Sequence, residues 1–211
     1  MTAVNRTKLE EGDKLLKEAN KLCSPSMLSL RFKPDWEQAG PLLERAAVAY
    51  RQGRAWEQAV GAYERAAQAQ ERMGSPWHAG KALESCAVCC KEGGNRSGVA
   101  HFSKRAAEMY SEAGRPSTGA EALAKGARLL EEGDPKAALQ LYEDALELLE
   151  HDDSKDTRGQ DIYRDVINHC VRSKQWDRAA EVLLRFGGVC DATGARQSMA
   201  KSYLGAVVVQ L

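Results

Sequence analysis

The sequence has few aromatic residues and no excess of charge of either sign. Phe, Trp and Tyr make up only 6% of the 211 residues, and 30 Lys and Arg balance 30 Asp and Glu. Since non-specific binding to nucleic acid requires a basic excess, this balance argues against a nucleic-acid partner. The remaining composition, 43% hydrophobic and 28% charged, is typical of a folded chain.

The sequence also lacks long apolar runs. No stretch approaches the roughly 18 consecutive apolar residues that a membrane-spanning helix needs. The first 22 residues, MTAVNRTKLEEGDKLLKEANKL, are charged throughout and contain no apolar segment of a signal peptide. We therefore expect the cysteines in a reducing cytosol. They are Cys23, Cys86, Cys89, Cys90, Cys170 and Cys190.

Motifs of an enzyme or of a metal site are missing as well. The sequence contains no G-x-S-x-G, no phosphate-binding loop and no dinucleotide fingerprint. Cys86, Cys89 and Cys90 are close together, but a zinc site needs four ligands and the other cysteines are single and distant. We expect these three to be small buried side chains. The sequence thus predicts no catalytic residue, metal, cofactor or small-molecule substrate.

What the sequence does contain is an internal repeat. WEQAGPLLERAAVAY begins at Trp36, and WEQAVGAYERAAQAQ begins 20 residues later at Trp56. Related segments follow about every 40 residues, and Trp176 lies 120 residues after Trp56. Apolar residues within each unit recur at i, i+4, i+7 and i+8, and no window alternates with period two. The pattern predicts amphipathic helices joined in hairpins of about 40 residues.

Proline and glycine mark the expected helix boundaries. Pro34, Pro76, Pro116 and Pro135 are placed where helices begin, Ser75 and Asp134 are expected N-caps, and glycines follow the helix ends. We expect about ten helices in one domain spanning residues 1–211, an all-α, right-handed α-solenoid of hairpins like those of tetratricopeptide repeats. The expected ranges are 5–22, 35–52, 55–73, 76–92, 96–113, 116–131, 135–150, 157–173, 176–192 and 195–211.

Basic residues occur in the expected turns. Arg51 and Arg54 flank the turn in AYRQGRAW, Lys174 lies 120 residues past Arg54, and Arg115 belongs to a turn of the other phase. Such charges can line one edge of a solenoid and contact an acidic rod. They can equally be cations that interact with helix C-termini. Both interpretations are open at this point. Arg45, Arg65 and Arg105 share another repeat position, which we expect to be solvated.

Four segments in this order resemble the gamma-type members of the soluble NSF attachment protein (SNAP) family, gamma-SNAP. The resemblance extends from about residue 8 to the last residue and rests on the segment order and the turn sequences. The segments are RFKPDWEQA with ERAAVAY, SPWHAGKALESCA, GRPSTGAEALAKGARLLEEGDPKAALQLYEDAL and AKSYLGAVVVQL.

The resemblance implies an adaptor that carries no catalytic residue. Members of the family grip the SNARE four-helix bundle left after membrane fusion and recruit the NSF ATPase, which pulls the bundle apart. It also implies a cytoplasmic protein, bound peripherally to the cytosolic face of transport-pathway membranes. Alpha-type relatives hold the bundle with basic residues on one face, and Arg54 and Arg115 fall on such positions. The candidate SNARE contacts are Arg51, Arg54, Arg115 and Lys174.

The segment CSPSMLSLRF, residues 23–32, joins the first two expected helices and carries apolar side chains. It occupies the place of the family's apolar loop, which touches the bilayer. The resemblance therefore implies a membrane contact, and packing under the first hairpin is the alternative. The candidate residues are Met27, Leu28, Leu30 and Phe32.

Compared with the family, the chain lacks most of the C-terminal helical bundle, which engages NSF. We therefore expect NSF recruitment to be weakened or lost while SNARE and membrane binding remain. The alternative function is a general peptide-binding scaffold or co-chaperone, which would need a narrow groove with Lys and Asn donors. The 40-residue period and the apolar segment favour the adaptor.

Overall fold

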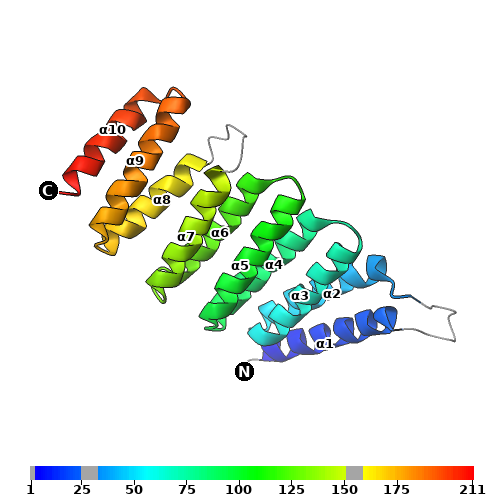
Figure 1. Ribbon diagram of the computed structural model, residues 1–211. Coiled ribbons are helices and arrows are strands. Elements are labelled where there is room, and N and C mark those ends of the chain that lie inside the picture. The colour runs from blue at the N-terminus through cyan, green and yellow to red at the C-terminus, as the bar shows by residue number, and fades with distance from the viewer. Residues whose placement is uncertain (1–2, 25–32, 151–158) are drawn as a thin grey trace. The chain divides into compact units, whose positions relative to one another are not determined.

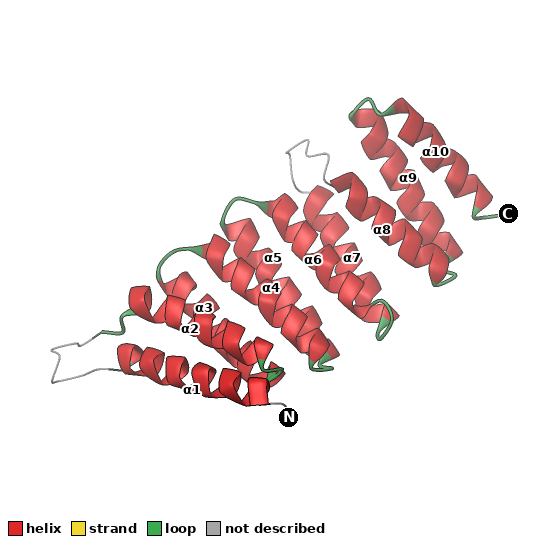
Figure 2. Cartoon of the chain, turned by 180° about the vertical axis from the view of Figure 1, so that it is seen from behind, coloured by secondary structure: helices red, strands yellow, loops and turns green. Residues whose placement is uncertain are grey.

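The computed structural model describes residues 3–24, 33–150 and 159–211, and these residues form ten α-helices and no strand (Figures 1 and 2). The predicted all-α class and solenoid architecture are confirmed, and each helix boundary lies within three residues of its predicted position. The helices are α1 (Ala3–Cys23), α2 (Trp36–Gln52), α3 (Trp56–Arg72), α4 (Pro76–Glu92), α5 (Arg96–Glu112), α6 (Pro116–Leu130), α7 (Pro135–Glu150), α8 (Gly159–Arg172), α9 (Trp176–Ala192) and α10 (Arg196–Val208).

Contacts between helices group the chain into two compact units. Unit 1 is Met1–Arg115 and holds α1 to α5, and unit 2 is Pro116–Leu211 and holds α6 to α10. The single domain over residues 1–211 stays a prediction. None of the described helices is both long and apolar enough to span a bilayer.

Alanine fills most of the helix contacts in unit 1. Ala46, Ala66 and Ala106, which are equivalent repeat positions, are completely buried. The small side chain allows neighbouring helices to approach closely, and alanine also has the highest helix propensity. This packing explains why an Ala-Ala pair recurs at this position of the repeat.

Tyrosine rings lie on glycines of the preceding helix, and this contact recurs. A methyl group at Gly12 would lie 2.8 Å from the ring of Tyr50, and one at Gly80 would lie 2.9 Å from the ring of Tyr110. The Tyr50 hydroxyl donates to Asp13 Oδ1 (2.7 Å). Burial raises the pKa of Tyr50, and the hydrogen bond to the carboxylate raises it further. Each ring therefore fixes the register of two helices.

Helix starts follow the predicted signals with two corrections. Pro34 does not begin α2 but precedes its N-cap Asp35, whose side chain accepts a hydrogen bond from the Gln38 N–H (3.1 Å). The Asp134 side chain accepts a hydrogen bond from the Ala137 N–H (3.1 Å), as an N-cap should. Ser75 makes no such cap bond. Its hydroxyl lies instead 2.7 Å from His78 Nδ1, because the imidazole three residues later competes for it.

Candidate interaction surface

Six of the turns between helices share one hydrogen-bond pattern. The Ala55 N–H donates to the Tyr50 carbonyl (2.9 Å), and the Lys174 turn has the same bond from Gln175 to Cys170 (2.9 Å). This six-residue closure is a Schellman-type end, whose next-to-last residue adopts a left-handed conformation. It occurs at residues 50–55, 70–75, 90–95, 110–115, 170–175 and 190–195.

Arg54 and Lys174 occupy the left-handed position of their turns. Both have φ of +57°, and they are the non-glycine residues with positive φ in the described part of the chain. The other four turns carry glycine at this position, namely Gly74, Gly94, Gly114 and Gly194. A side chain in this conformation costs roughly 1–2 kcal/mol, which glycine avoids. The chain thus carries strain at two equivalent turns, and both residues there are exposed cations.

Glycine was predicted to close the helix ends, and Gly53 is an exception. Its φ is −78°, an ordinary helical value, because the left-handed residue of the turn comes one position later at Arg54. A methyl group at Gly53 would lie 3.2 Å from the Asn5 carbonyl of α1. Gly53 is therefore needed for close helix packing and not for its backbone conformation.

Successive helices run in opposite directions, so turns alternate between the two edges of unit 1 (Figure 1). The α2–α3 turn shares an edge with the α4–α5 turn, and a methyl group at Gly93 would lie 3.0 Å from Trp56 Cβ. Arg51 and Arg54 thus lie on the same edge as Lys91 and Arg96, which flank the α4–α5 turn. We call these four residues the basic edge.

Lys91 and Arg96 were missed as candidates by the sequence reasoning. The available signal was helix direction, since turns two helices apart fall on the same edge. Arg96 is exposed and Lys91 is half-buried. The same edge also carries Glu57 and Glu92, so its charge is positive but mixed.

Arg115 lies on the opposite edge of unit 1, in the α5–α6 turn (Figure 1). Its guanidinium is 5.9 Å from the centre of the Trp77 ring, and the Lys81 ammonium is 5.2 Å from the same ring. Trp77 also meets the Tyr110 ring edge-on at 5.0 Å. Cation–π attraction therefore holds Arg115 against α4. The structure does not place it beside Arg51 and Arg54, so a continuous row of these three residues is excluded.

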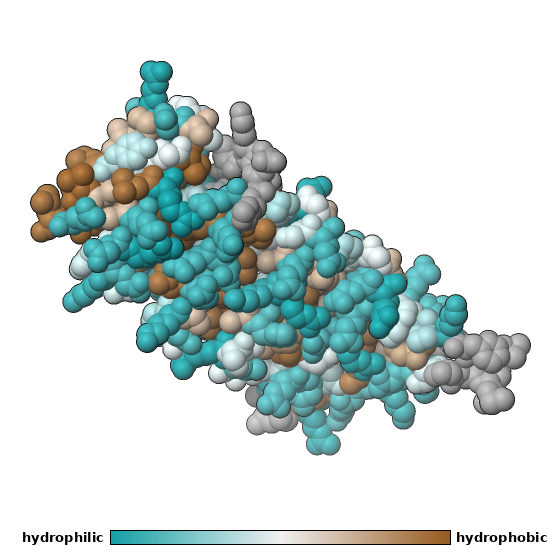
Figure 3. Space-filling model, viewed as in Figure 1, coloured by the Kyte–Doolittle hydropathy of each residue, from teal (hydrophilic) through white to brown (hydrophobic). Residues whose placement is uncertain are grey.

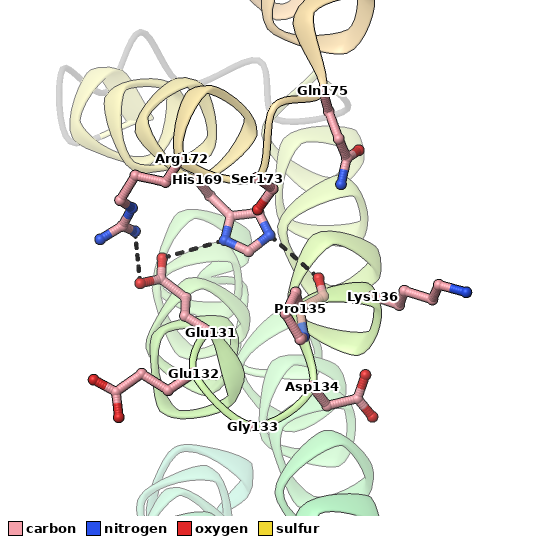
Figure 4. Close-up of a pocket in the computed structure, with 10 residues that line it drawn as sticks. All are labelled: Glu131, Glu132, Gly133, Asp134, Pro135, Lys136, His169, Arg172, Ser173 and Gln175. Atoms are coloured by element: carbon pink, nitrogen blue, oxygen red, sulfur yellow. Dashed lines mark hydrogen bonds and ion pairs between the residues drawn. The ribbon is translucent and has the colours of Figure 1, made fainter.

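Lys174 belongs to unit 2, in the α8–α9 turn, and its chain neighbours Ser173 and Gln175 line a surface depression (Figure 4). A cluster of polar side chains lies at this depression. Glu131 accepts hydrogen bonds from Tyr142 (2.8 Å) and Arg172 (2.7 Å). The buried His169 donates from Nε2 to the Pro135 carbonyl (3.2 Å), and its Nδ1 lies 3.7 Å from Glu131. The cluster ties α8 to the α6–α7 hairpin and is satisfied internally.

Several arginines on helix faces are engaged between helices, unlike the candidate cations. Arg105 of α5 donates to Glu64 (2.8 Å) and lies 3.3 Å from Glu71, both on α3. Arg65 donates to Asn20 of α1 (2.6 Å). The expectation that this repeat position is merely solvated was therefore wrong for Arg65 and Arg105. The four predicted contacts, by contrast, form no ion pair within the described residues. They are Arg51, Arg54, Arg115 and Lys174.

The three clustered cysteines are core residues of α4. Cys86, Cys89 and Cys90 are at most 2% exposed. Burial raises the pKa of the Cys89 thiol to about 11 and raises that of Cys86 and Cys90 as well. A raised pKa keeps a thiol protonated and unreactive at neutral pH. Their positions agree with the expected role as small buried side chains.

The predicted membrane contacts lie outside the described residues. They are Met27, Leu28, Leu30 and Phe32. In the sequence they lie between α1 and α2.

Comparison with known proteins gives the following relatives. Residues 9–208 match the family model "Soluble NSF attachment protein, SNAP". The chain is 37% identical over 201 residues to the gamma-soluble NSF attachment protein of Arabidopsis thaliana, covering 95% of this chain and 68% of that protein. It is 27% identical to the Dictyostelium discoideum protein of the same name, covering 95% of this chain and 61% of that protein. The chain therefore spans about two thirds of the length of these relatives.

Among solved structures, BtubC (BKLC) from P. vanneervenii matches with a TM-score of 0.50 at 15% identity. The match covers 100% of this chain and 92% of that chain. At this identity the likeness concerns the fold alone.

Proposed function

Because the chain belongs to the soluble NSF attachment protein family, we propose that it is an adaptor that binds a SNARE four-helix bundle through its basic edge. Family membership makes the chain an adaptor and not an enzyme, as the sequence predicted. Its general role is related to SNAREs and NSF. Which residues contact the bundle, and on which membrane, belongs to the proposal.

The observation that carries the proposal is the strain at Arg54 and Lys174. Four equivalent turns use glycine, and these two use a long cation at a cost of roughly 1–2 kcal/mol each. A residue that weakens the fold at an exposed position is best explained by a contact outside the fold. A cation at this position suits an acidic surface, and the free edge of a helical array offers a straight row to a rod-shaped partner.

The four residues of the basic edge come from two consecutive hairpins of unit 1. Arg51 and Arg54 lie at the α2–α3 turn, and Lys91 and Arg96 lie at the α4–α5 turn. Exposed charges of this kind mainly increase the association rate and set orientation, and each contributes modestly to affinity. Binding should accordingly weaken as salt increases, since the Debye length shortens from about 10 Å at 0.1 M to about 3 Å at 1 M.

The experiment measures binding of a preassembled SNARE bundle to the purified chain at low and high salt. We expect saturable binding at low salt that weakens with salt. Arg51→Glu with Arg54→Glu should weaken it about tenfold, and Arg115→Glu, on the opposite edge, serves as the matched control and should change it little. If the unmutated chain does not bind the bundle at low salt, the proposed adaptor function is contradicted. If the Arg51→Glu with Arg54→Glu variant and the Arg115→Glu variant lose the same affinity for the bundle, binding through the basic edge is contradicted.

We also propose that the segment holding Met27, Leu28, Leu30 and Phe32 contacts the bilayer, and that the protein is cytoplasmic and peripheral on transport-pathway membranes. The support is the place of the segment between α1 and α2 and its apolar composition. Flotation with liposomes tests this, since replacing Leu30 and Phe32 by Ser should reduce co-flotation while leaving bundle binding unchanged.

The link to NSF is proposed from the family alone. ATP-dependent disassembly of a SNARE bundle by purified NSF in the presence of the chain tests it. We expect the chain to accelerate disassembly, and disassembly no faster than without the chain would contradict the link.

A further inference from the structure

A groove on unit 2 is lined by side chains of three helices, α8, α9 and α10. Its volume is about 390 Å³, at the lower end of the range for ligand pockets. The residues from α8 are Arg164, Ile167 and Asn168, and those from α10 are Ser198, Lys201 and Ser202. Positions i, i+3 and i+4 share one face of a helix, so α8 and α10 each present one face to the groove. We call it the α8–α10 groove.

Apolar side chains of α8 and α9 form one part of this groove. Leu183 and Phe186 of α9 line it and are 9% and 5% exposed, and Ile167 of α8 is half-buried. The Phe186 ring stacks on the buried Tyr163 ring, with the two ring centres 5.4 Å apart. This stacking holds the ring in place, so the apolar part of the groove exists before any ligand arrives.

A close contact between α9 and α10 fixes the third helix of the groove. A methyl group at Gly187 would lie 2.5 Å from the ring of Tyr203. This is the same contact of tyrosine with glycine that joins α5 to α4 through Tyr110 and Gly80. Because glycine lets the ring lie directly on α9, the position of α10 beside the groove is set by packing.

The exposed polar side chains of the groove are hydrogen-bond donors. The Arg164 guanidinium lies 5.8 Å from the centre of the Phe186 ring, so a cation adjoins the apolar part. Within the described residues, Lys201 forms no ion pair and the Asn168 side chain makes no hydrogen bond. None of the described residues that line the groove is acidic, and Asp161, which pairs with Arg164 (2.5 Å), is not among them.

This polar character is not general to α10. Figure 3 shows apolar surface gathered at the end of the chain that Figure 1 marks with C, where Val207 and Val208 are 58% and 59% exposed. The groove residues of α10 are polar without exception. Donors that lack an acidic partner are thus collected at the groove.

We propose that the α8–α10 groove binds the C-terminal end of a peptide. The terminal carboxylate accepts hydrogen bonds from Asn168 and Lys201, and an apolar last side chain packs on Ile167 and Phe186. Charge complementarity favours this ligand, because the groove offers an ammonium and an amide without a competing acid on its lining.

The adjacency of donors and apolar side chains favours a chain end over an internal acidic residue. A terminal residue carries its carboxylate and its side chain on the same carbon atom, so it can contact both parts of the groove at once. An Asp or Glu side chain supplies the acid alone. The small volume of the groove also suits one or two residues better than a segment that passes through.

The site is separate from the proposed function. It uses none of the residues of the basic edge, so each proposal can fail while the other holds. A groove with Lys and Asn donors is also what the alternative interpretation of the sequence, a peptide-binding scaffold, requires.

NMR titration of the ¹⁵N-labelled chain with three N-acetylated dipeptides tests the proposal. Acetyl-Ala-Leu with a free carboxylate carries both groups, its C-terminal amide lacks the charge, and acetyl-Ala-Gly with a free carboxylate lacks the apolar side chain. We expect the free Ala-Leu peptide to shift the signals of the Asn168 side-chain amide and of the Lys201 N–H. Its dissociation constant should be about 1–10 mM, as for a ligand of this size, and at least about threefold higher for the other two peptides.

Substitutions distinguish this contact from general attraction to a cationic surface. Lys201→Gln with Asn168→Ala should weaken binding of the free Ala-Leu peptide about five- to tenfold, since both carboxylate donors are lost. Arg196→Gln with Gln197→Ala is the matched control. It removes a cation and an amide from exposed positions of α10 that do not line the groove, and it should change the affinity little.

Several results overturn the proposal. It fails if no groove signal shifts, if the amide or the Gly peptide binds as tightly as the free Ala-Leu peptide, or if the two variants lose the same affinity. If a preassembled SNARE bundle shifts the groove signals and the dipeptide does not, the groove belongs to the bundle and the proposal is overturned. Binding that needs the carboxylate, the apolar side chain and the Lys201–Asn168 pair supports it.

Discussion

Replacing Arg54 by glycine should stabilise the fold. Arg54 has φ of +57° in a turn whose four equivalents carry glycine, so the substitution relieves roughly 1–2 kcal/mol of backbone strain. Glycine also makes the unfolded chain more flexible, which offsets about 0.4–1 kcal/mol. The expected net gain is about 0.5–1 kcal/mol. For a chain of this size, that corresponds to an increase in Tm of about 1–4 °C.

Thermal unfolding followed by circular dichroism measures this, with urea unfolding as an independent check. Gln52→Gly, two residues earlier and exposed within the last turn of α2, is the matched control and should lower Tm, since glycine weakens a regular helix. Gly94→Arg places a cation at the equivalent left-handed position and should lower Tm by a similar amount. The reasoning is refuted if Arg54→Gly lowers Tm as Gln52→Gly does.

Three further predictions follow from packing and titration. Gly80→Ala should destabilise the fold by about 1–3 kcal/mol in urea unfolding, because a methyl group there would lie 2.9 Å from the Tyr110 ring. Gly61→Ala, with nothing within 4 Å, should stabilise the fold by up to about 1 kcal/mol. Equal effects of the two substitutions would contradict the close contact between Gly80 and Tyr110. Lys174→Gly should raise Tm as Arg54→Gly does, and an unchanged or lower Tm would show that the left-handed turn carries no strain. Stability should fall as pH rises from about 9 to about 11, because burial raises the pKa of the Cys89 thiol from 9.0 to about 11 and the unfolded chain then binds fewer protons. One such thiol contributes a slope of up to about 1.4 kcal/mol per pH unit. Cys89→Ala should make the slope shallower without abolishing it, because the pKa of Cys86 and of Cys90 is raised as well.

The helices could be predicted closely because their signals are local. Pro76, Pro116 and Pro135 begin helices where proline lacks only a hydrogen bond that the first turn does not make. The 20-residue offset between Trp36 and Trp56 fixed the number of helices, since each copy is one helix of a hairpin. Such features depend on residues within one or two turns of each other.

The interaction surface could be predicted only in part, because it depends on which turns share an edge. Arg54 was found from its place in a turn, but its left-handed conformation follows from the Schellman-type bond of Ala55 to Tyr50. Arg115 was grouped with it, although alternating helix direction puts it on the opposite edge against Trp77. Likewise, the ion pairs of Arg105 with α3 depend on helix–helix distances that periodicity does not give.

If Arg54 serves a partner at the expense of the fold, replacing it should strengthen the fold and weaken binding in the same variant. The affinity of Arg54→Gly for a preassembled SNARE bundle is measured by titration at low salt, on the same samples whose Tm has been determined. We expect a variant that is more stable than the original chain and binds the bundle several-fold more weakly, with a shallower salt dependence. A variant that is more stable and binds as tightly as the original chain would contradict it.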